Sequence, residues 1–222
     1  MNQLQPSQEK VVRIQDENEE GRLPLLNMGY KKFLIAGVDE VGKGCLFGPV
    51  YAAAVILSKE NETKLLSQGL KDSKKLSHLQ RHSLVPLIKT NSIAWTIGQA
   101  SAREIDVFGI RNATEKAMLR ALEKFSSPPD LILVDGTLPI RFWPGKQKTQ
   151  VRGESHFASI AAASVLAKEA RDELIKRLAR KYNCYGLEKN KGYGTEIHRT
   201  KLIKEGATKL HRKSFISRLK ID

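Results

Sequence analysis

Short apolar runs alternate with polar or turn-forming residues through the first two thirds of the chain. Four of these runs are too short for buried helices and contain β-branched residues, and they predict strands at 33–40, 51–57, 92–101 and 129–136. Three glycines and a proline lie within residues 41–49, which predicts a tight turn directly after the first strand.

Segments with apolar residues three or four positions apart lie between and after these strands. They predict helices at 77–89, 112–125, 155–182 and 195–206. We expect Ser77 to cap the first helix and Pro86 to kink or end it. The first half of the third helix is small and apolar, so it should lie buried against the sheet. Because strands and helices are mixed along the chain, the sequence predicts an α/β sandwich around a central sheet.

Three acidic residues end two of the predicted strands. Asp39 and Glu40 end the strand at 33–40, and Asp135 lies at the end of the strand at 129–136. Sites in open α/β folds collect beyond strand ends, so these carboxylates converge if the two strands are neighbours. Adjacent residues on a regular strand point to opposite faces, so Asp39 and Glu40 share one centre only if the strand bends or ends there. Repulsion among the three acids would be relieved by a divalent cation, and hard oxygen ligands select Mg²⁺ or Mn²⁺.

The charge balance favours a polyanionic partner. Lys and Arg number 38 against 24 acidic residues, which gives a net charge of +14, and phosphate contacts from such a surface release counterions. Residues 181–222 hold eleven basic and four acidic residues, a net +7, whereas residues 1–30 carry a net −2. We therefore predict a flexible polar and acidic N-terminal arm at 1–32 and one catalytic domain at 33–222, whose basic C-terminal part contacts nucleic acid.

The sequence indicates no membrane partner. Its apolar runs fall short of the ~20 residues that span a bilayer, and its first ten residues lack the charged-then-apolar plan of a secretory signal. We expect a cytoplasmic protein and a monomer, because nothing in the sequence indicates an obligate oligomer. Cys45 and Cys184 lie far apart in the sequence and are expected to be free thiols.

Seven blocks of the sequence resemble bacterial ribonuclease HII, a member of the type 2 ribonuclease H family. They run in the family's order from about residue 33 to 217. The blocks are GVDEVGKG (37–44), FGPVYAAAVIL (47–57), LKDSKKLS (70–77), LILVDG (131–136), SIAAASVLAKEARDE (159–173), NKGYGT (190–195) and HRKSF (211–215).

The resemblance implies a fold, a substrate and a product. The fold would be ribonuclease H-like, with a five-stranded mixed sheet flanked by helices and a helical C-terminal extension. The substrates would be RNA–DNA hybrids, cut in the RNA strand, and duplex DNA with embedded ribonucleotides. Two-metal phosphodiester hydrolysis with Mn²⁺ or Mg²⁺ suits such a set of carboxylates and would leave 5′-phosphate and 3′-hydroxyl ends.

The resemblance also implies the catalytic acids. The family carboxylates that bind the metals match Asp39, Glu40 and Asp135. A fourth catalytic acid, usually aspartate between glycine and serine, matches Glu154, whose extra methylene leaves its reach open. A glutamate here and a Gly-Lys-Gly turn also resemble ribonuclease HIII, a longer type with an extra N-terminal domain.

Substrate-binding residues follow from three further blocks. The turn Gly42-Lys43-Gly44, commonly Gly-Arg-Gly in the family, would sense the ribose 2′-hydroxyl through its backbone. Tyr193 matches a tyrosine that stacks on the sugar at the RNA–DNA junction. We expect Ser73 and Lys74 to bind backbone phosphate, with a solvated loop as the alternative for each.

Other interpretations remain open at this point. Asp172 competes with Glu154 for the fourth acidic position, although a salt bridge with Arg171 or Arg177 is the favoured interpretation. His211 would contact phosphate or cap structure rather than perform chemistry. A non-catalytic basic nucleic-acid-binding protein would explain the charge but not the acids at strand ends, and an integrase-like or junction-resolving nuclease would share the fold.

Overall fold

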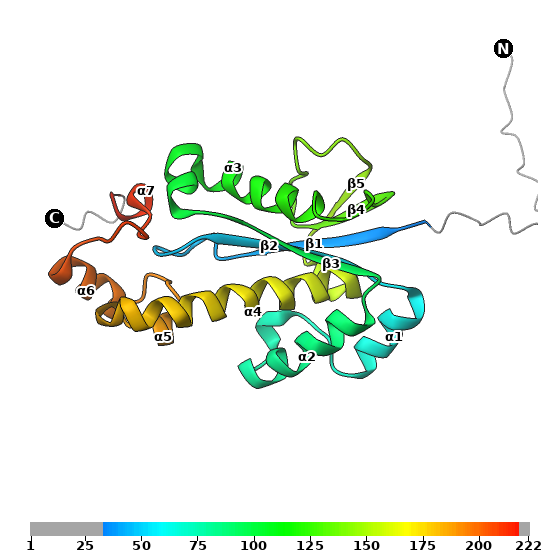
Figure 1. The fold of residues 1–222 in the computed structure, drawn as a ribbon, viewed down its shortest axis with the longest axis horizontal. Coiled ribbons are helices and arrows are strands. Elements are labelled where there is room, and N and C mark those ends of the chain that lie inside the picture. Colours follow the sequence, from blue (N-terminus) through cyan, green and yellow to red (C-terminus); the bar gives the residue numbers. More distant parts are fainter. Residues whose placement is uncertain (1–32, 218–222) are drawn as a thin grey trace, which may run out of the picture. The chain divides into compact units, whose positions relative to one another are not determined.

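The computed structural model describes residues 33–217, which form a central sheet with helices on both faces (Figure 1). The strands lie in the order β3-β2-β1-β4-β5. β1 pairs antiparallel with β2 and parallel with β4; β2 and β3 are antiparallel, and β4 and β5 are parallel. The strands are β1 (Ile35–Val41), β2 (Val50–Ile56), β3 (Ala94–Ala100), β4 (Leu131–Asp135) and β5 (Gln147–Gln150). This sheet confirms the five-stranded mixed α/β architecture.

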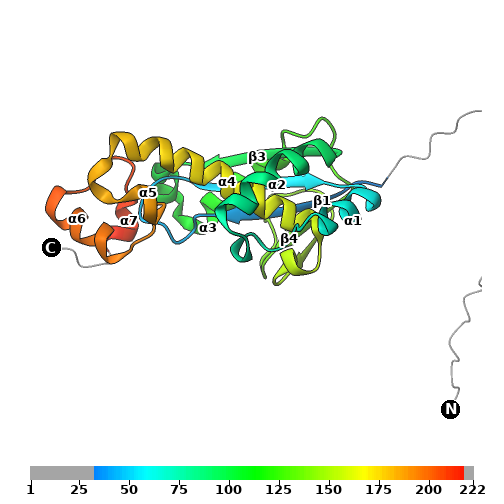
Figure 2. The same cartoon turned by 90° about the horizontal axis from the view of Figure 1, so that it is seen from below.

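The helices divide between the two faces of the sheet. In Figure 1, α3 covers one face and α4, with α1 and α2 outside it, covers the other. α5, α6 and α7 gather beyond one end of the sheet, as Figure 2 also shows, and form the helical C-terminal extension. The helices are α1 (Lys59–Ser67), α2 (His78–Asn91), α3 (Ala102–Leu122), α4 (Ala158–Lys181), α5 (Leu187–Asn190), α6 (Glu196–Glu205) and α7 (Lys213–Ile216), with short 3-10 turns η1 (Ser73–Lys75), η2 (Gly153–Ser155) and η3 (Asn183–Tyr185).

The central strands are buried on both faces. On β2, Ala52 and Ala54 pack in the cluster beneath α3, whereas Ala53 and Val55 pack in the cluster with α1, α2 and α4. A strand covered on both sides has no need of polar residues, so it appears in the sequence as a continuous apolar run. The small residues on β2 also let the helices approach the sheet closely.

Most predicted elements are confirmed with small shifts at their ends, and five helical or strand segments were missed. The missed segments are α1, the first half of α3, β5 and the short helices α5 and α7. Gly109 has φ +77° and interrupts α3 between two helical halves, of which only the second was predicted. Pro86 was predicted to kink or end its helix, and the ending is wrong: α2, capped by Ser77 as expected, runs on to Asn91. Leu84 and Ile88 are buried on either side of the proline, so packing holds the helix together there.

Two predictions concern residues outside the described part of the chain. The acidic arm at 1–32 lies wholly outside it, and so do residues 218–222 of the predicted catalytic domain. Across residues 33–217, no helix has both the length and the apolar character needed to cross a membrane.

Candidate active site

Asp39 and Asp135 lie at the same level on neighbouring strands. The parallel register of β1 and β4 pairs Val38 with Val134, and the two acids are the next residues along each strand. The expectation that these strands are neighbours is therefore confirmed. Because β4 ends at Asp135, its carboxylate leaves the sheet beside that of Asp39.

Glu40 approaches the site from the opposite face of β1. The strand neither ends nor loses its register at these acids, since Asp39, Glu40 and Val41 all pair with β2. Regular alternation therefore turns the two carboxylates to opposite faces. Among the described residues, pairing with β4 stops at Val38 and Val134. The edge of β1 is open beyond that pair, so both faces give access to the same space.

The carboxyl group of Asp39 is buried among other acids and hydroxyls. Burial raises its pKa well above the ordinary range, and the charges of Glu40 and Asp135 raise the pKa further. Asp39 Oδ1 accepts the backbone N–H of Glu40 at 2.7 Å, and the hydroxyl of Ser164 on α4 lowers the pKa through a hydrogen bond. Ser73 supports that hydroxyl, because the two serine Oγ atoms lie 2.8 Å apart.

Glu154 shares the site with Asp135. The backbone N–H of Gly153 donates to Asp135 Oδ1 at 2.8 Å, which fixes the turn η2 against the end of β4. Burial raises the pKa of Glu154, and its contact with Asp135 raises the pKa further. Among the described residues, Glu154 Oε2 is a buried oxygen without a hydrogen-bond partner. The four predicted catalytic acids are thus neighbours in pairs: Asp39 lies near Glu40 and Asp135, and Asp135 lies near Glu154.

The donor set suits a hard divalent cation. In the described part of the chain, no three His, Cys, Asp or Glu side chains converge closely enough, as they stand, to hold an ion. However, the carboxyl groups of Asp39 and Glu154 have raised pKa values, and Glu154 Oε2 has no hydrogen-bond partner among the described residues. Lys43 already places its ammonium 2.5 Å from Glu40 Oε1. A positive charge among these carboxylates would relieve their repulsion, so the residues fit Mg²⁺ or Mn²⁺.

The glycine turn after β1 lies against the loop that carries Tyr193. Gly42 has φ +90°, and a Cβ there would lie 2.3 Å from Arg171 Nε, so only glycine fits. Cys45 and Tyr193 form an isolated β-bridge between the two loops. Burial raises the pKa of Tyr193 to about 12, so its hydroxyl remains a hydrogen-bond donor at neutral pH.

Arg171 holds these two loops together, a role that the sequence analysis missed. Its guanidinium is fully buried and donates to the carbonyls of Phe47 at 3.0 Å, Pro49 at 3.0 Å and Lys191 at 2.9 Å. In the sequence, this arginine lies in the amphipathic half of a helix and is indistinguishable from a surface residue. The available signal in the sequence was the glycine-rich loops, because their buried backbone carbonyls need hydrogen-bond donors such as an arginine.

Three other predicted residues have clear positions. Ser73 is buried with its hydroxyl against Ser164, whereas Lys74 is exposed on η1; phosphate binding by either residue stays a prediction. Asp172 forms a salt bridge, as interpreted, but not with the predicted arginines. Its partners are Lys168 at 2.8 Å, one helical turn away, and Arg81 at 3.9 Å.

Two buried histidines anchor the loop of Tyr193. Thr208 N–H donates to His211 Nδ1 at 3.0 Å, so the neutral ring carries its proton on Nε2. That Nε2 lies 3.1 Å from His198 Nε2, and His198 Nδ1 in turn lies 2.9 Å from the carbonyl oxygen of Tyr193. One chain of neutral donors and acceptors therefore runs to the loop, and the prediction that His211 caps structure is confirmed.

This histidine pair should make the fold less stable in acid. Burial lowers the pKa of both rings, that of His211 to about 4, whereas an unfolded histidine has a pKa near 6.5. Between these values the unfolded chain binds more protons, so stability falls as the pH drops from about 6.5 to about 4. In urea titrations, we expect a smaller difference in unfolding free energy between pH 7.5 and pH 5 for His211→Gln than for the parent. An equal difference would show that His211 is not responsible.

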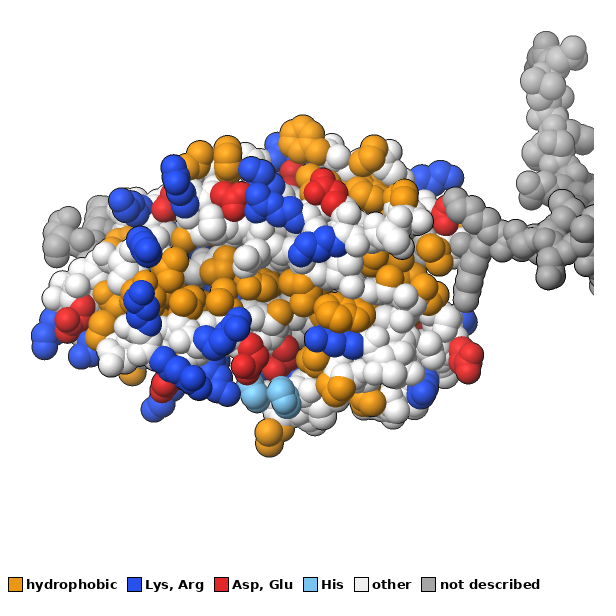
Figure 3. All heavy atoms as spheres, in the orientation of Figure 1, with side chains coloured by type: hydrophobic (Ala, Val, Ile, Leu, Met, Phe, Trp, Pro, Cys, Tyr) orange, Lys and Arg blue, Asp and Glu red, His pale blue; other side chains and the backbone are white. Residues whose placement is uncertain are grey.

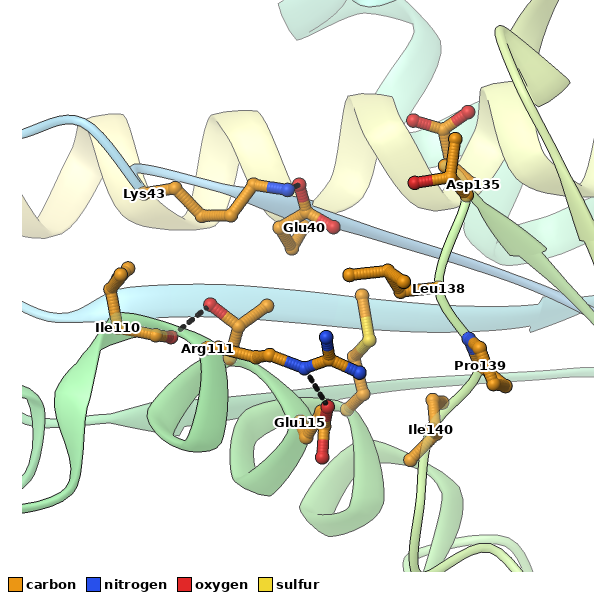
Figure 4. Close-up of a pocket in the computed structure, with 13 residues that line it drawn as sticks. Glu40, Lys43, Ile110, Arg111, Glu115, Asp135, Leu138, Pro139 and Ile140 are labelled. Carbon is orange, nitrogen blue, oxygen red and sulfur yellow. Dashed lines mark hydrogen bonds and ion pairs between the residues drawn. The ribbon is translucent and has the colours of Figure 1, made fainter.

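A cavity of about 350 Å³ opens beside the acids, between α3 and the loop after β4 (Figure 4). Glu40, Asp135 and Lys43 are among the residues that line it. Its opposite wall is mainly apolar. The remaining lining residues are Ile110, Arg111, Thr114, Glu115, Met118, Gly136, Thr137, Leu138, Pro139 and Ile140.

The family profile and a close relative give the same family, and a solved structure gives the same fold. The profile of the family Ribonuclease HII matches residues 36–218. Ribonuclease HII of Prochlorococcus marinus (strain NATL1A) is 92% identical over 191 residues, which cover 86% of this chain and 98% of the relative. The crystal structure of ribonuclease H2 from Pyrococcus horikoshii OT3 aligns with a TM-score of 0.71 at 23% identity, over 84% of this chain and 96% of that chain, and shows the fold.

A structure of Bst-RNase HIII in complex with Mn²⁺ also shares the fold, with a TM-score of 0.65 at 18% identity. The alignment covers 83% of this chain but 64% of that one, in line with the longer type expected for ribonuclease HIII. The family profile and the close relative support ribonuclease HII over the ribonuclease HIII-like and non-catalytic alternatives. The chain belongs to the ribonuclease HII family and is an endoribonuclease that acts on RNA–DNA hybrids.

Proposed function

We propose that Asp39, Glu40 and Asp135 hold Mn²⁺ or Mg²⁺ and that Glu154 completes the catalytic site. The enzyme would hydrolyse phosphodiesters in the RNA strand of hybrids and at ribonucleotides embedded in duplex DNA. The observation that carries this proposal is the register of β1 and β4, which aligns Asp39 with Asp135 at the open edge of the sheet. The Mn²⁺ complex of the ribonuclease HIII with the same fold supports the choice of metal.

Asp39 and Asp135 each have a distinct support. Divalent ions held by the carboxylates would activate a water and stabilise charge on the leaving 3′ oxygen. The hydroxyl of Ser164 and the N–H of Glu40 orient Asp39, and the N–H of Gly153 orients Asp135. These neutral donors position the carboxylates without cancelling the negative charge that attracts a cation. The products would be a 5′-phosphate and a 3′-hydroxyl.

The loops beside the acids would recognise the ribonucleotide. A Cβ at Gly44 would meet no heavy atom within 4 Å, so the backbone of the glycine turn is open to a ligand. We assign Gly42, Lys43 and Gly44 to the ribose 2′-hydroxyl, which distinguishes RNA from DNA. Tyr193 is 40% exposed and bridged to the same turn through Cys45, so its ring can contact the neighbouring sugar.

The wider surroundings of the site fit a nucleic acid duplex. Lys and Arg side chains gather over the part of the face in Figure 3 where the end of α4 and the C-terminal helices lie. Such a surface attracts phosphates without regard to sequence, and Lys74 would add a contact from η1. We propose that the protein acts as a cytoplasmic monomer in ribonucleotide excision repair and DNA replication.

Incision of a duplex that contains one ribonucleotide tests the proposal. With Mn²⁺ or Mg²⁺ present, we expect a single cut beside that ribonucleotide, and with EDTA we expect none. Electrophoresis against marker strands reports the position of the cut, and phosphatase treatment reports its 5′-phosphate. A matched all-DNA duplex is the control. Cutting of RNA–DNA hybrids without cutting at the single ribonucleotide would overturn the assignment of embedded ribonucleotides as substrates.

A further inference from the structure

Arg111 on α3 lines the cavity of Glu40 and Asp135 and has no part in the proposed function. Lys43, the other cation that lines this cavity, is engaged by Glu40 at 2.5 Å. The Arg111 side chain is 47% exposed. In Figure 4 its guanidinium lies between Glu115 on one side and the side chains of Glu40 and Leu138 on the other. A cation therefore faces the space beside the proposed catalytic acids.

A buried carboxylate fixes Arg111 in this position. Glu115, one helical turn further along α3, accepts from Arg111 Nε at 3.0 Å and is itself only 7% exposed. The same carboxylate accepts Arg141 Nε with both oxygens, at 2.9 and 3.1 Å. One carboxylate thus pairs with two guanidinium groups, so Arg111, Glu115 and Arg141 together retain a net charge of +1. Because Glu115 is held from both sides, Arg111 is more constrained than an ordinary exposed arginine.

Within residues 33–217, Arg111 uses one of its donor groups. Its Nε is bonded to Glu115, and none of the hydrogen bonds between described residues involves its two terminal amino groups. A guanidinium stays charged and offers donors in a planar fork that matches two oxygens of a phosphate. The part of the cavity lining beside Arg111 includes the apolar side chains of Met118 and Ile140.

We propose that Arg111 binds a backbone phosphate adjacent to the cleaved bond, held in place by Glu115 and Arg141. This inference rests on the proposed assignment of Glu40 and Asp135 as catalytic acids. The substrate is a polyanion with a phosphate at every nucleotide, so one placed at the acids brings its neighbours to the walls of the cavity. Arg111 is then a positioning residue, which sets the register of the strand rather than reacting with it.

The salt dependence of hybrid binding separates this role from a structural one. Affinity would be measured by fluorescence anisotropy in EDTA, between 50 and 200 mM KCl, for the parent, Arg111→Ala, Arg111→Lys and Arg103→Ala. Arg103 is an exposed arginine of the same helix that does not line the cavity. We expect Arg111→Ala to bind about tenfold more weakly and to lower the salt slope by about one. Arg111→Lys should keep the slope and lose about threefold in affinity, since it keeps the charge without the fork. Arg103→Ala should stay within about twofold of the parent.

Neutral methylphosphonates, placed one at a time along each strand, would locate the contact. One position beside the cut should weaken binding by the parent but not by Arg111→Ala, as expected for two partners of one interaction. The inference is overturned if Arg111→Ala keeps the parent affinity and slope, or if every methylphosphonate affects both proteins equally. If Arg111→Ala does not fold, Arg111→Lys is compared with the parent instead, and its affinity and methylphosphonate profile decide whether Arg111 binds a phosphate. Failure of the parent to cut hybrids with metal would instead overturn the proposed function.

Discussion

Asp135→Asn is expected to slow hybrid cleavage by about a thousandfold and to leave hybrid binding nearly unchanged. The substitution removes one negative ligand from a site where a metal ion would stabilise the transition state by several kcal/mol, and each 1.36 kcal/mol corresponds to a tenfold change in rate. The fold should survive, because the amide oxygen of asparagine can still accept the N–H of Gly153 that now lies 2.8 Å from Asp135 Oδ1. Single-turnover cleavage with Mn²⁺, alongside anisotropy for binding, measures both effects.

Two other substitutions of acidic residues show whether the effect is specific to Asp135. Glu173→Gln removes a carboxylate from a half-exposed position on α4 and should cleave at the parent rate. Glu154→Gln should fall between them, because its longer side chain stands where the family usually has aspartate and its Oε2 has no partner among the described residues. Turnover of Asp135→Asn within a few-fold of the parent would remove Asp135 from the site.

Gly37→Ala is expected to destabilise the folded protein by about 3 kcal/mol, the upper end of the usual cost of overpacking. A Cβ at Gly37 would lie 2.3 Å from both Ile160 N and Ser159 C. These are backbone atoms of α4, so no side chain can turn aside to make room. Either β1 or α4 must shift, and β1 carries Asp39 and Glu40 a few residues further on.

Urea titration of Gly37→Ala against Gly44→Ala tests this packing. A Cβ at Gly44 would meet nothing within 4 Å, and Gly44 is not among the glycines with positive φ. Its replacement by alanine should therefore change the unfolding free energy by less than about 1 kcal/mol. Equal midpoints for the two variants would show that the close approach of β1 and α4 is not needed for stability.

Elements with strong apolar patterns were predictable, and elements held by tertiary contacts were not. β1, β2 and β4 are short apolar runs because both of their faces are buried, and a strand buried on both faces consists mostly of apolar residues. β5 lies at the edge of the sheet and has the polar sequence QKTQ, so no apolar run indicates a strand there. α1 is a short and mostly polar helix that buries only Leu65 among its residues. Local sequence contains little of the information that places these two elements.

The site divides in the same way. The positions of Asp39 and Asp135 followed from strand ends, and the family resemblance identified Glu154. By contrast, Arg171 gains its role from the carbonyls of Phe47 and Pro49, more than 100 positions away in the sequence. Arg111 gains its role from the Glu40 and Asp135 side chains of other elements, which line the same cavity. A buried arginine that binds carbonyls and an exposed arginine on a helix look alike in sequence. Only the fold distinguishes them.

The position of bound Mn²⁺ tests the central claim most directly. Crystals grown with Mn²⁺ and a hybrid that resists cleavage would locate the ion by its anomalous scattering. We predict a peak within coordination distance, ~2.0–2.3 Å, of oxygens from Asp39, Glu40 and Asp135, as hard oxygen ligands require. An ion bound to the substrate away from these three carboxylates, or held by other side chains, would contradict the assignment of the metal site.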